Sequence, residues 1–108
     1  MSIDTVKKTK ETQRVTEPPM FAVLVLNDNT TPFEYVVASI MNFFDKTSNE
    51  AIEIMKVAHT SGKALCGVFT KDYAETKATT ATNHAKQYGL ELQYVIEPES
   101  SKDNKEDV

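Results

Sequence analysis

A run of small polar residues lies where the chain could recognise a small charged group. Asn27, Asp28 and Asn29 follow an apolar segment directly, and Thr30 and Thr31 come next. The amide and carboxylate oxygens of these side chains accept hydrogen bonds, so the cluster is suited to a cationic group. The same residue types also form turns in which Asn and Asp bond their own backbone. On the sequence alone, a binding site and a simple turn both remain possible.

His59 is the other residue with suitable chemistry. It follows Met55 by one helical turn on a predicted helix, so it is expected at the polar rim of an apolar face. A neutral imidazole accepts a hydrogen bond from an ammonium group. Asn27, Asp28 and His59 together offer the acceptors that the three donors of an α-ammonium need, as in capture of an N-terminal amine. A lone histidine at this position is also compatible with a structural role.

The other reactive residues show no pattern typical of a metal site or of catalysis. The second histidine, His84, belongs to another predicted helix, and the single cysteine, Cys66, lies inside an apolar strand. No ligand pair has zinc-site spacing. A Cys66–His59 nucleophile pair, the enzymatic alternative, lacks a visible third orienting group. We therefore expect no enzymatic activity, no metal and no cofactor, and a small buried hydrophobe at Cys66.

Six predicted elements must position these residues, in the order strand, helix, helix, strand, helix, strand. Apolar runs predict strands at 21–26, 64–70 and 92–96. Helical spacing predicts a helix at 32–44, a second that starts after Thr47 and stops before Gly62, and a third that carries 74–88 and ends at Gly89. The expected fold class is α+β, with a small three-stranded antiparallel sheet packed against three helices.

Local signals define the helix ends. Thr31 and Glu34 predict a capping box with Pro32 at the first helical position, and Thr47 and Glu50 predict a second box. Residues expected to share a helical face are Phe33, Val36, Val37, Ile40 and Phe44 on the first helix, Ala51, Ile54 and Ala58 on the second, and Ala74, Ala78, Ala81, Ala85 and Tyr88 on the third.

Composition limits the class of protein. A chain of 108 residues with 40% hydrophobic residues predicts one small domain with a modest core. The net charge of −4 without a basic patch argues against nucleic acid. The apolar runs are too short for a bilayer, no signal peptide is visible, and one cysteine fits a reducing compartment, so we expect a cytoplasmic protein. Residues 1–19 predict a disordered N-terminal arm, 20–97 the core domain, and 98–108 a disordered acidic tail.

Several separated motifs, taken together, resemble the ClpS family. They are Asn27-Asp28, Thr31-Pro32, His59, the run from Gly62 to Thr70, and Ala74-Glu75-Thr76-Lys77. ClpS proteins are adaptors of the Clp protease. The resemblance, which covers about 20–97, implies a non-catalytic adaptor that binds N-degrons beginning with Leu, Phe, Tyr or Trp. It also implies delivery of these substrates to a Clp AAA+ unfoldase.

The resemblance assigns roles residue by residue. Asn27, Asp28 and His59 correspond to the α-amino clamp. Asp72, Glu75 and Lys77 fall in the region that contacts the N-domain of a ClpA-type unfoldase, and the N-terminal arm corresponds to the extension that engages the unfoldase. The residues implied for the hydrophobic pocket are Thr31, Phe33, Val36, Met55, Ala58 and Leu92.

Three positions depart from the family pattern. Asn29 stands where many members have a second aspartate, Phe33 replaces a common methionine, and Ala58 replaces a common valine. Because a rigid ring replaces an adaptable chain, we expect Leu to be accepted and the largest aromatic residues to be disfavoured. The alternative function is a ClpS-like regulator or inhibitor that docks on the unfoldase without delivering ordinary N-degron substrates.

Overall fold

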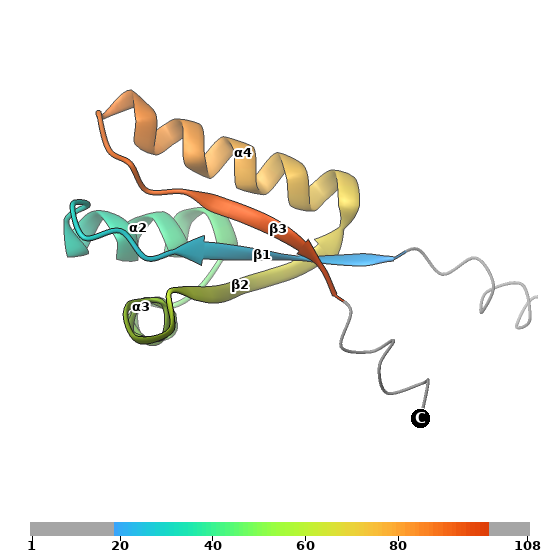
Figure 1. The fold of residues 1–108 in the computed structure, drawn as a ribbon, viewed down its shortest axis with the longest axis horizontal. Helices are drawn as coiled ribbons and strands as arrows, with labels where there is room; N and C mark the ends of the chain where they lie inside the picture. Colours follow the sequence, from blue (N-terminus) through green and yellow to red (C-terminus); the bar gives the residue numbers. More distant parts are fainter. Residues whose placement is uncertain (1–18, 100–108) are drawn as a thin grey trace, which may run out of the picture.

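A computed structural model describes residues 19–99, which form six elements in the predicted order (Figure 1). The strands are β1 (Met20–Leu26), β2 (Lys63–Thr70) and β3 (Tyr94–Pro98), and the helices are α2 (Phe33–Phe44), α3 (Ser48–Ser61) and α4 (Lys71–Gln87). The sheet has the order β2-β1-β3, and both neighbours of β1 run antiparallel to it. The predicted α+β architecture is confirmed.

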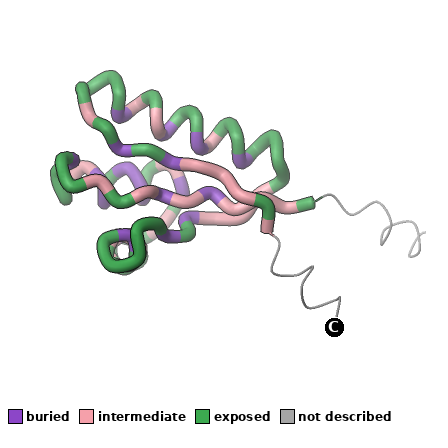
Figure 2. The backbone as a smooth tube through the Cα atoms, viewed as in Figure 1, coloured by how far each residue is buried: buried purple, intermediate pink, exposed green. Residues whose placement is uncertain are grey.

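Helix α4 packs along the sheet and contacts all three strands. Its alanines at 74, 78, 81 and 85 are buried, and in Figure 2 the buried positions of α4 lie on the side facing the sheet. Small side chains let the helix axis approach the strands closely. Tyr88 was expected on the same face, and this is wrong because it follows the last helical residue and is 64% exposed.

The three helices differ in how they begin. The capping box of α3 is confirmed, since Glu50 N–H donates to Thr47 Oγ1 (3.1 Å) and Thr47 N–H donates to Glu50 Oε1 (2.9 Å). The box predicted for α2 is wrong. Pro32 is the N-cap of α2, and no side chain caps the helix. The Thr31 hydroxyl, which was expected to form the box, donates to Asp28 instead. Helix α2 therefore begins one residue later than expected, at Phe33.

Glycines end α3 and α4, as the sequence predicted. Gly62 has a φ of 94° and Gly89 a φ of 73°, in the left-handed region that glycine adopts readily. After α4, Gly89 N–H donates to the carbonyl of Lys86 (2.9 Å) and Leu90 N–H to that of Ala85 (3.0 Å). These two bonds form a Schellman motif, which satisfies the last carbonyls of the helix.

Strand β3 lies two residues further along the chain than predicted. Leu92 precedes it, and Pro98, expected in the acidic tail, is its last residue. Glu99 N–H donates to the Met20 carbonyl (2.9 Å), so the two ends of the described region meet at one end of the sheet. Residues 1–18 and 100–108, which contain most of the predicted arm and tail, lie outside the described residues.

The core lies between the sheet and the helices. Its largest fully buried side chains belong to Ile40, Leu92, Val23, Val25 and Cys66. Burial raises the pKa of Cys66 to about 12, so its thiol stays protonated at neutral pH. Its burial agrees with the small hydrophobe expected at this position.

Candidate functional site

A pocket of about 170 Å³ lies at the carboxyl end of β1. It forms where the 27–31 loop, the start of α2, the last turns of α3 and the segment before β3 converge. It brings together every residue predicted for the amine clamp and the hydrophobic pocket, and adds Val25, Leu26 and Asn29. Sequence reasoning did not assign Val25 and Leu26 to the site, although they end the apolar strand that leads into the polar loop.

The inner wall of the pocket is apolar. Val36, Ala58 and Leu92 are buried, and Met55 is half-buried beside them. Phe33 was expected on the inner face of α2, but its side chain is 48% exposed. As the first residue of the helix it lies at the edge of the molecule, where only part of its ring can face the pocket. The wall therefore suits an apolar side chain.

Two polar residues of the pocket keep unused acceptors. Asn27 is exposed, and its backbone N–H donates to the Gly62 carbonyl (2.9 Å), which ties the loop to the end of α3. His59 is exposed in the last turn of α3. Within residues 19–99, neither side chain hydrogen-bonds to another residue. Both side chains are therefore available to a ligand.

Asp28 is held by its own loop. Its Oδ1 accepts from the backbone N–H (3.2 Å) and hydroxyl (3.0 Å) of Thr30, and its Oδ2 accepts from the hydroxyl of Thr31. These bonds, that from Thr31 foremost, lower the pKa of Asp28 and keep it charged at neutral pH. The turn that the sequence left as an alternative is thus present, and two of its residues, Asp28 and Thr31, also line the pocket. A carboxylate has further lone pairs, so it can still face a cation.

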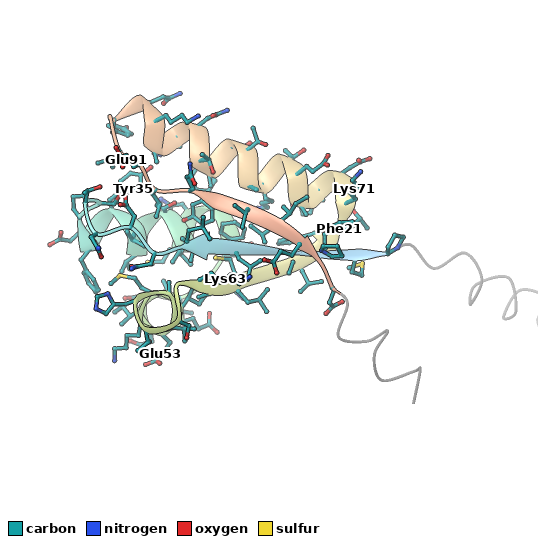
Figure 3. The ribbon with its side chains drawn as sticks, in the orientation of Figure 1. Phe21, Tyr35, Glu53, Lys63, Lys71 and Glu91 are labelled. Carbon is teal, nitrogen blue, oxygen red and sulfur yellow. The ribbon has the colours of Figure 1, made fainter. Side chains whose placement is uncertain are left out.

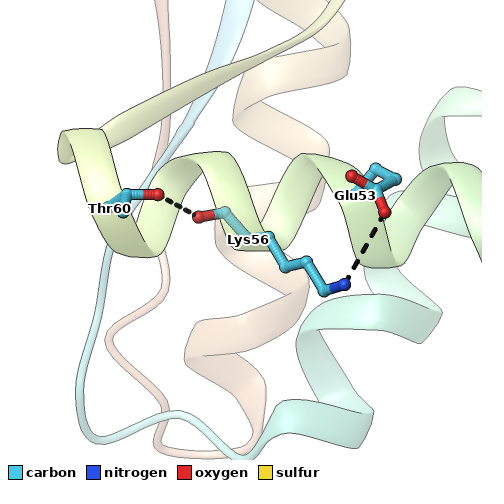
Figure 4. A network of polar contacts seen from close by, with 3 residues as sticks. All are labelled: Glu53, Lys56 and Thr60. Carbon is cyan, nitrogen blue, oxygen red and sulfur yellow. Dashed lines mark hydrogen bonds and ion pairs between the residues drawn. The ribbon is translucent and has the colours of Figure 1, made fainter.

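The opposite side of α3 is polar and separate from the pocket. Lys56 Nζ lies 3.7 Å from Glu53 Oε2, and the Thr60 hydroxyl donates to the Lys56 carbonyl at 2.6 Å. Figure 4 shows these three residues and the two interactions between them. The ion pair is well exposed, so it contributes little stability. Met55, Ala58 and His59 lie on the other side of α3, and all three line the pocket.

The arrangement is an apolar hollow whose mouth carries a negative charge and hydrogen-bond acceptors. Such a site fits a ligand with an apolar side chain next to a cationic group. Among the described residues, no three His, Cys, Asp or Glu side chains are grouped to hold a metal ion. His84 lies outside the pocket, where its Nδ1 pairs with the Tyr35 hydroxyl at 2.5 Å. No helix within 19–99 combines the length and apolar character needed to span a membrane.

Residues 16–95 match the family model for "ATP-dependent Clp protease adaptor protein ClpS". The chain belongs to the ClpS family. It is 42% identical over 88 residues to the ClpS adapter of Herminiimonas arsenicoxydans, covering 82% of this chain and 86% of the relative. It is 44% identical over 93 residues to that of Deinococcus radiodurans, covering 86% and 82%. The protein is an adaptor of the Clp protease and not an enzyme.

A solved structure of the same family resembles the fold. Agrobacterium tumefaciens ClpS2, bound to L-phenylalaninamide, aligns with a TM-score of 0.75 at 36% identity. The alignment covers 77% of this chain and all of the ClpS2 chain. The family predicted from the separated sequence motifs is therefore confirmed.

The residues implied for the unfoldase contact lie away from the pocket. Asp72 and Glu75 are exposed near the start of α4, which Figure 3 marks by Lys71 at the far end of the molecule from Glu91. Lys77 is half-buried, and its Nζ donates to the Phe43 carbonyl (2.6 Å) at the end of α2. The pocket and this segment occupy opposite ends of β1, since Met20 pairs with Thr70 while Leu26 leads into the pocket.

Proposed function

We propose that this ClpS-family protein binds polypeptides that begin with a bulky hydrophobic residue and delivers them to a ClpA-type AAA+ unfoldase. One observation carries the proposal: the apolar pocket opens between Asn27, Asp28 and His59. The first side chain of the substrate fills the hollow, and its α-ammonium lies at the mouth. The protein performs no chemistry on the substrate, since binding and delivery need only recognition.

The free amine is the feature that the mouth distinguishes. The side chains of Asn27 and His59 supply acceptors for two ammonium N–H groups, and Asp28 supplies the negative charge. A charged donor placed against fixed acceptors is recognised more strongly than a neutral amide. The ligand of the related ClpS2 structure, L-phenylalaninamide, supports this assignment because it joins an apolar side chain to a free α-amine.

Phe33 sets the upper size of the first residue. Its ring is stiffer than the methionine common at this position, and it forms part of the wall of a pocket of about 170 Å³. We assign Leu as a well-accepted first residue and Trp as a disfavoured one. Tighter binding of a Trp-initiated peptide than of the matching Leu-initiated peptide would contradict this ranking.

Delivery uses the other end of the molecule. Asp72, Glu75 and Lys77 belong to the surface that contacts the unfoldase N-domain, and the N-terminal arm engages the unfoldase from outside the described residues. The protein acts in the cytoplasm. In this arrangement a peptide in the pocket and the unfoldase on α4 do not compete for the same surface.

Titration of the full-length protein with fluorescent peptides tests the proposal. We expect a Leu-initiated peptide to lose on the order of 2 kcal/mol of binding free energy, about 30-fold in Kd, when its amine is acetylated. Asn27→Ala and His59→Ala should weaken the free peptide, whereas Thr60→Ala, next to His59 but on the polar side of α3, should not. Equal affinity for free and acetylated peptides contradicts the proposal. If the protein docks on the unfoldase but Leu-initiated substrates are not degraded, the result favours the alternative function, a regulator or inhibitor of the unfoldase.

A further inference from the structure

Tyr73 is an exposed aromatic side chain to which neither the sequence motifs nor the pocket assigns a role. It is the third residue of α4, and 53% of it is exposed to solvent. Asp72 precedes it, and Glu75 follows two residues later. An exposed tyrosine ring is suited to a binding interface, because Tyr is enriched at the centre of such interfaces.

Two neighbours fix the orientation of this ring. The Phe69 ring meets it edge to face, with centroids 5.2 Å apart and an interplanar angle of 79°. Lys77 Nζ lies 5.5 Å from the Tyr73 centroid, within reach of a cation–π interaction. Lys77 is itself anchored, because its Nζ donates to the Phe43 carbonyl (2.6 Å) and lies 5.9 Å from the centroid of Phe44.

We propose that Tyr73 is the anchor of the surface that docks on the unfoldase, and that Lys77 is the residue that positions it. The inference rests on the proposed function, because Lys77, which that function places in the unfoldase contact, lies against the Tyr73 ring, and Asp72 precedes Tyr73 in the chain. A ring already held in place loses little conformational entropy on binding, so its burial contributes more to affinity. The partner surface that fits has an apolar socket for the ring and a cationic group at its rim, opposite Asp72.

The position of Tyr73 fits this role. It follows Thr70, the last residue of β2, by three positions, and Thr70 pairs with Met20, whereas the pocket lies at the other end of β1. Docking through Tyr73 therefore leaves the pocket open to a substrate. The proposal also gives Lys77 a different role from Asp72, because the Lys77 ammonium group is already bound within the protein.

Binding of the full-length protein to a hexameric ClpA-type unfoldase tests the anchor. We expect Tyr73→Ala to raise Kd at least about tenfold, and Tyr73→Phe, which keeps the ring, to change it by less than about threefold. Tyr88→Ala is the matched control, because Tyr88 is exposed at the opposite end of the same helix. The Kd of the Tyr88→Ala variant for the unfoldase should be unchanged. Affinity for a Leu-initiated peptide, measured for each variant, reports that the fold is intact.

A double-mutant comparison tests the part of Lys77. Lys77→Met should weaken docking when Tyr73 is present and have no further effect on Tyr73→Ala, since it acts through the ring. An equal loss in both backgrounds would show direct contact with the partner and overturn the positioning role. If Tyr73→Ala binds the unfoldase as tightly as the unsubstituted protein does, Tyr73 is not the anchor, although the protein still docks on the unfoldase. If the unsubstituted protein does not dock, the proposed delivery function fails as well.

Discussion

At the residue scale, the 27–31 loop contains side chains that stabilise the loop and that also belong to the proposed binding site. Asp28 accepts hydrogen bonds from Thr30 and Thr31, which fixes the loop, and its charge remains at the mouth of the pocket. Asn27 contributes its backbone to the loop and keeps its side chain available. Turn geometry and the proposed ligand recognition are therefore compatible, because the Asp28 carboxylate keeps its charge and further lone pairs, and Asn27 joins the loop through its backbone alone.

Thr31→Val tests the strength of this loop. Valine keeps the shape of the buried threonine but removes the hydroxyl that donates to the Asp28 carboxylate. We expect the free energy of unfolding at pH 7 to fall by about 1–2 kcal/mol, because the lost bond is to a charged acceptor. Thr30→Val is the control, and it should cost less because Thr30 is exposed and its backbone N–H still donates to Asp28.

The effect should depend on pH with a defined sign. The pKa of Asp28 in the folded protein is lowered from its ordinary value of 3.8, chiefly by the Thr31 hydroxyl. The stabilisation from the carboxylate is therefore present above the ordinary value and is lost as the pH falls through the folded value. Urea unfolding curves should show the difference between Thr31→Val and the unsubstituted protein shrinking below about pH 4. A difference that grows with acidity contradicts this account.

At the element scale, local signals predicted what depends on neighbours in sequence. The capping box of α3 and the glycines after α3 and α4 are visible in the chain because their partners lie within a few residues. The box predicted for α2 failed because Asp28, on the other side of Thr31, competes for the same hydroxyl. Phe33 and Tyr88 fit a helical spacing, yet both lie at helix ends, where periodicity does not determine burial.

Thr47→Ala tests the contribution of the capping box of α3. The substitution removes the acceptor for Glu50 N–H, and we expect a loss of about 1 kcal/mol in the free energy of unfolding. Thr70→Ala is a close control, since Thr70 is the N-cap of α4 but makes no side-chain cap bond. Chemical denaturation of the two variants should separate them. Equal losses would mean that the hydrogen bond is not the source of the stability.

Gly67→Ala tests how the Phe69 ring packs against its own strand, β2. A Cβ at this position would lie 2.8 and 2.9 Å from two atoms of the Phe69 ring. That ring also contacts Phe44 and Tyr73, so moving it disturbs both. We expect a loss of about 1–3 kcal/mol on urea unfolding. The double variant Gly67→Ala/Phe69→Leu should lose less than the sum of its single substitutions, because the smaller side chain relieves the clash.

At the scale of the whole molecule, the fold places the pocket and the proposed docking surface at opposite ends of one short sheet. The pocket gathers residues from 25 to 92, and the resemblance to ClpS, not their spacing, indicated that they belong together. The contact of Lys77 with Phe43, which are 34 residues apart, could not be inferred from either position alone. Such long-range contacts depend on how helices pack, and no local signal in the sequence specifies them.

The separation of the two surfaces predicts that each can be disabled without the other. His59→Ala should abolish delivery of a Leu-initiated substrate while docking on the unfoldase is retained. Asp72→Lys/Glu75→Lys should weaken docking while the affinity for a Leu-initiated peptide changes by less than about twofold, because α4 begins far from the pocket. Peptide titration and unfoldase binding measure the two properties separately.

A mixture of these two variants then tests how the adaptor works. If one molecule must hold the substrate and the unfoldase together, it raises the local concentration of the substrate, and neither variant can do this for the other. An equimolar mixture should therefore degrade a Leu-initiated reporter no faster than the better single variant. Restored degradation would mean that docking and substrate binding act as separate events on different molecules. That result would favour the alternative function, a regulator that alters the unfoldase without holding the substrate, over an adaptor that holds both at once.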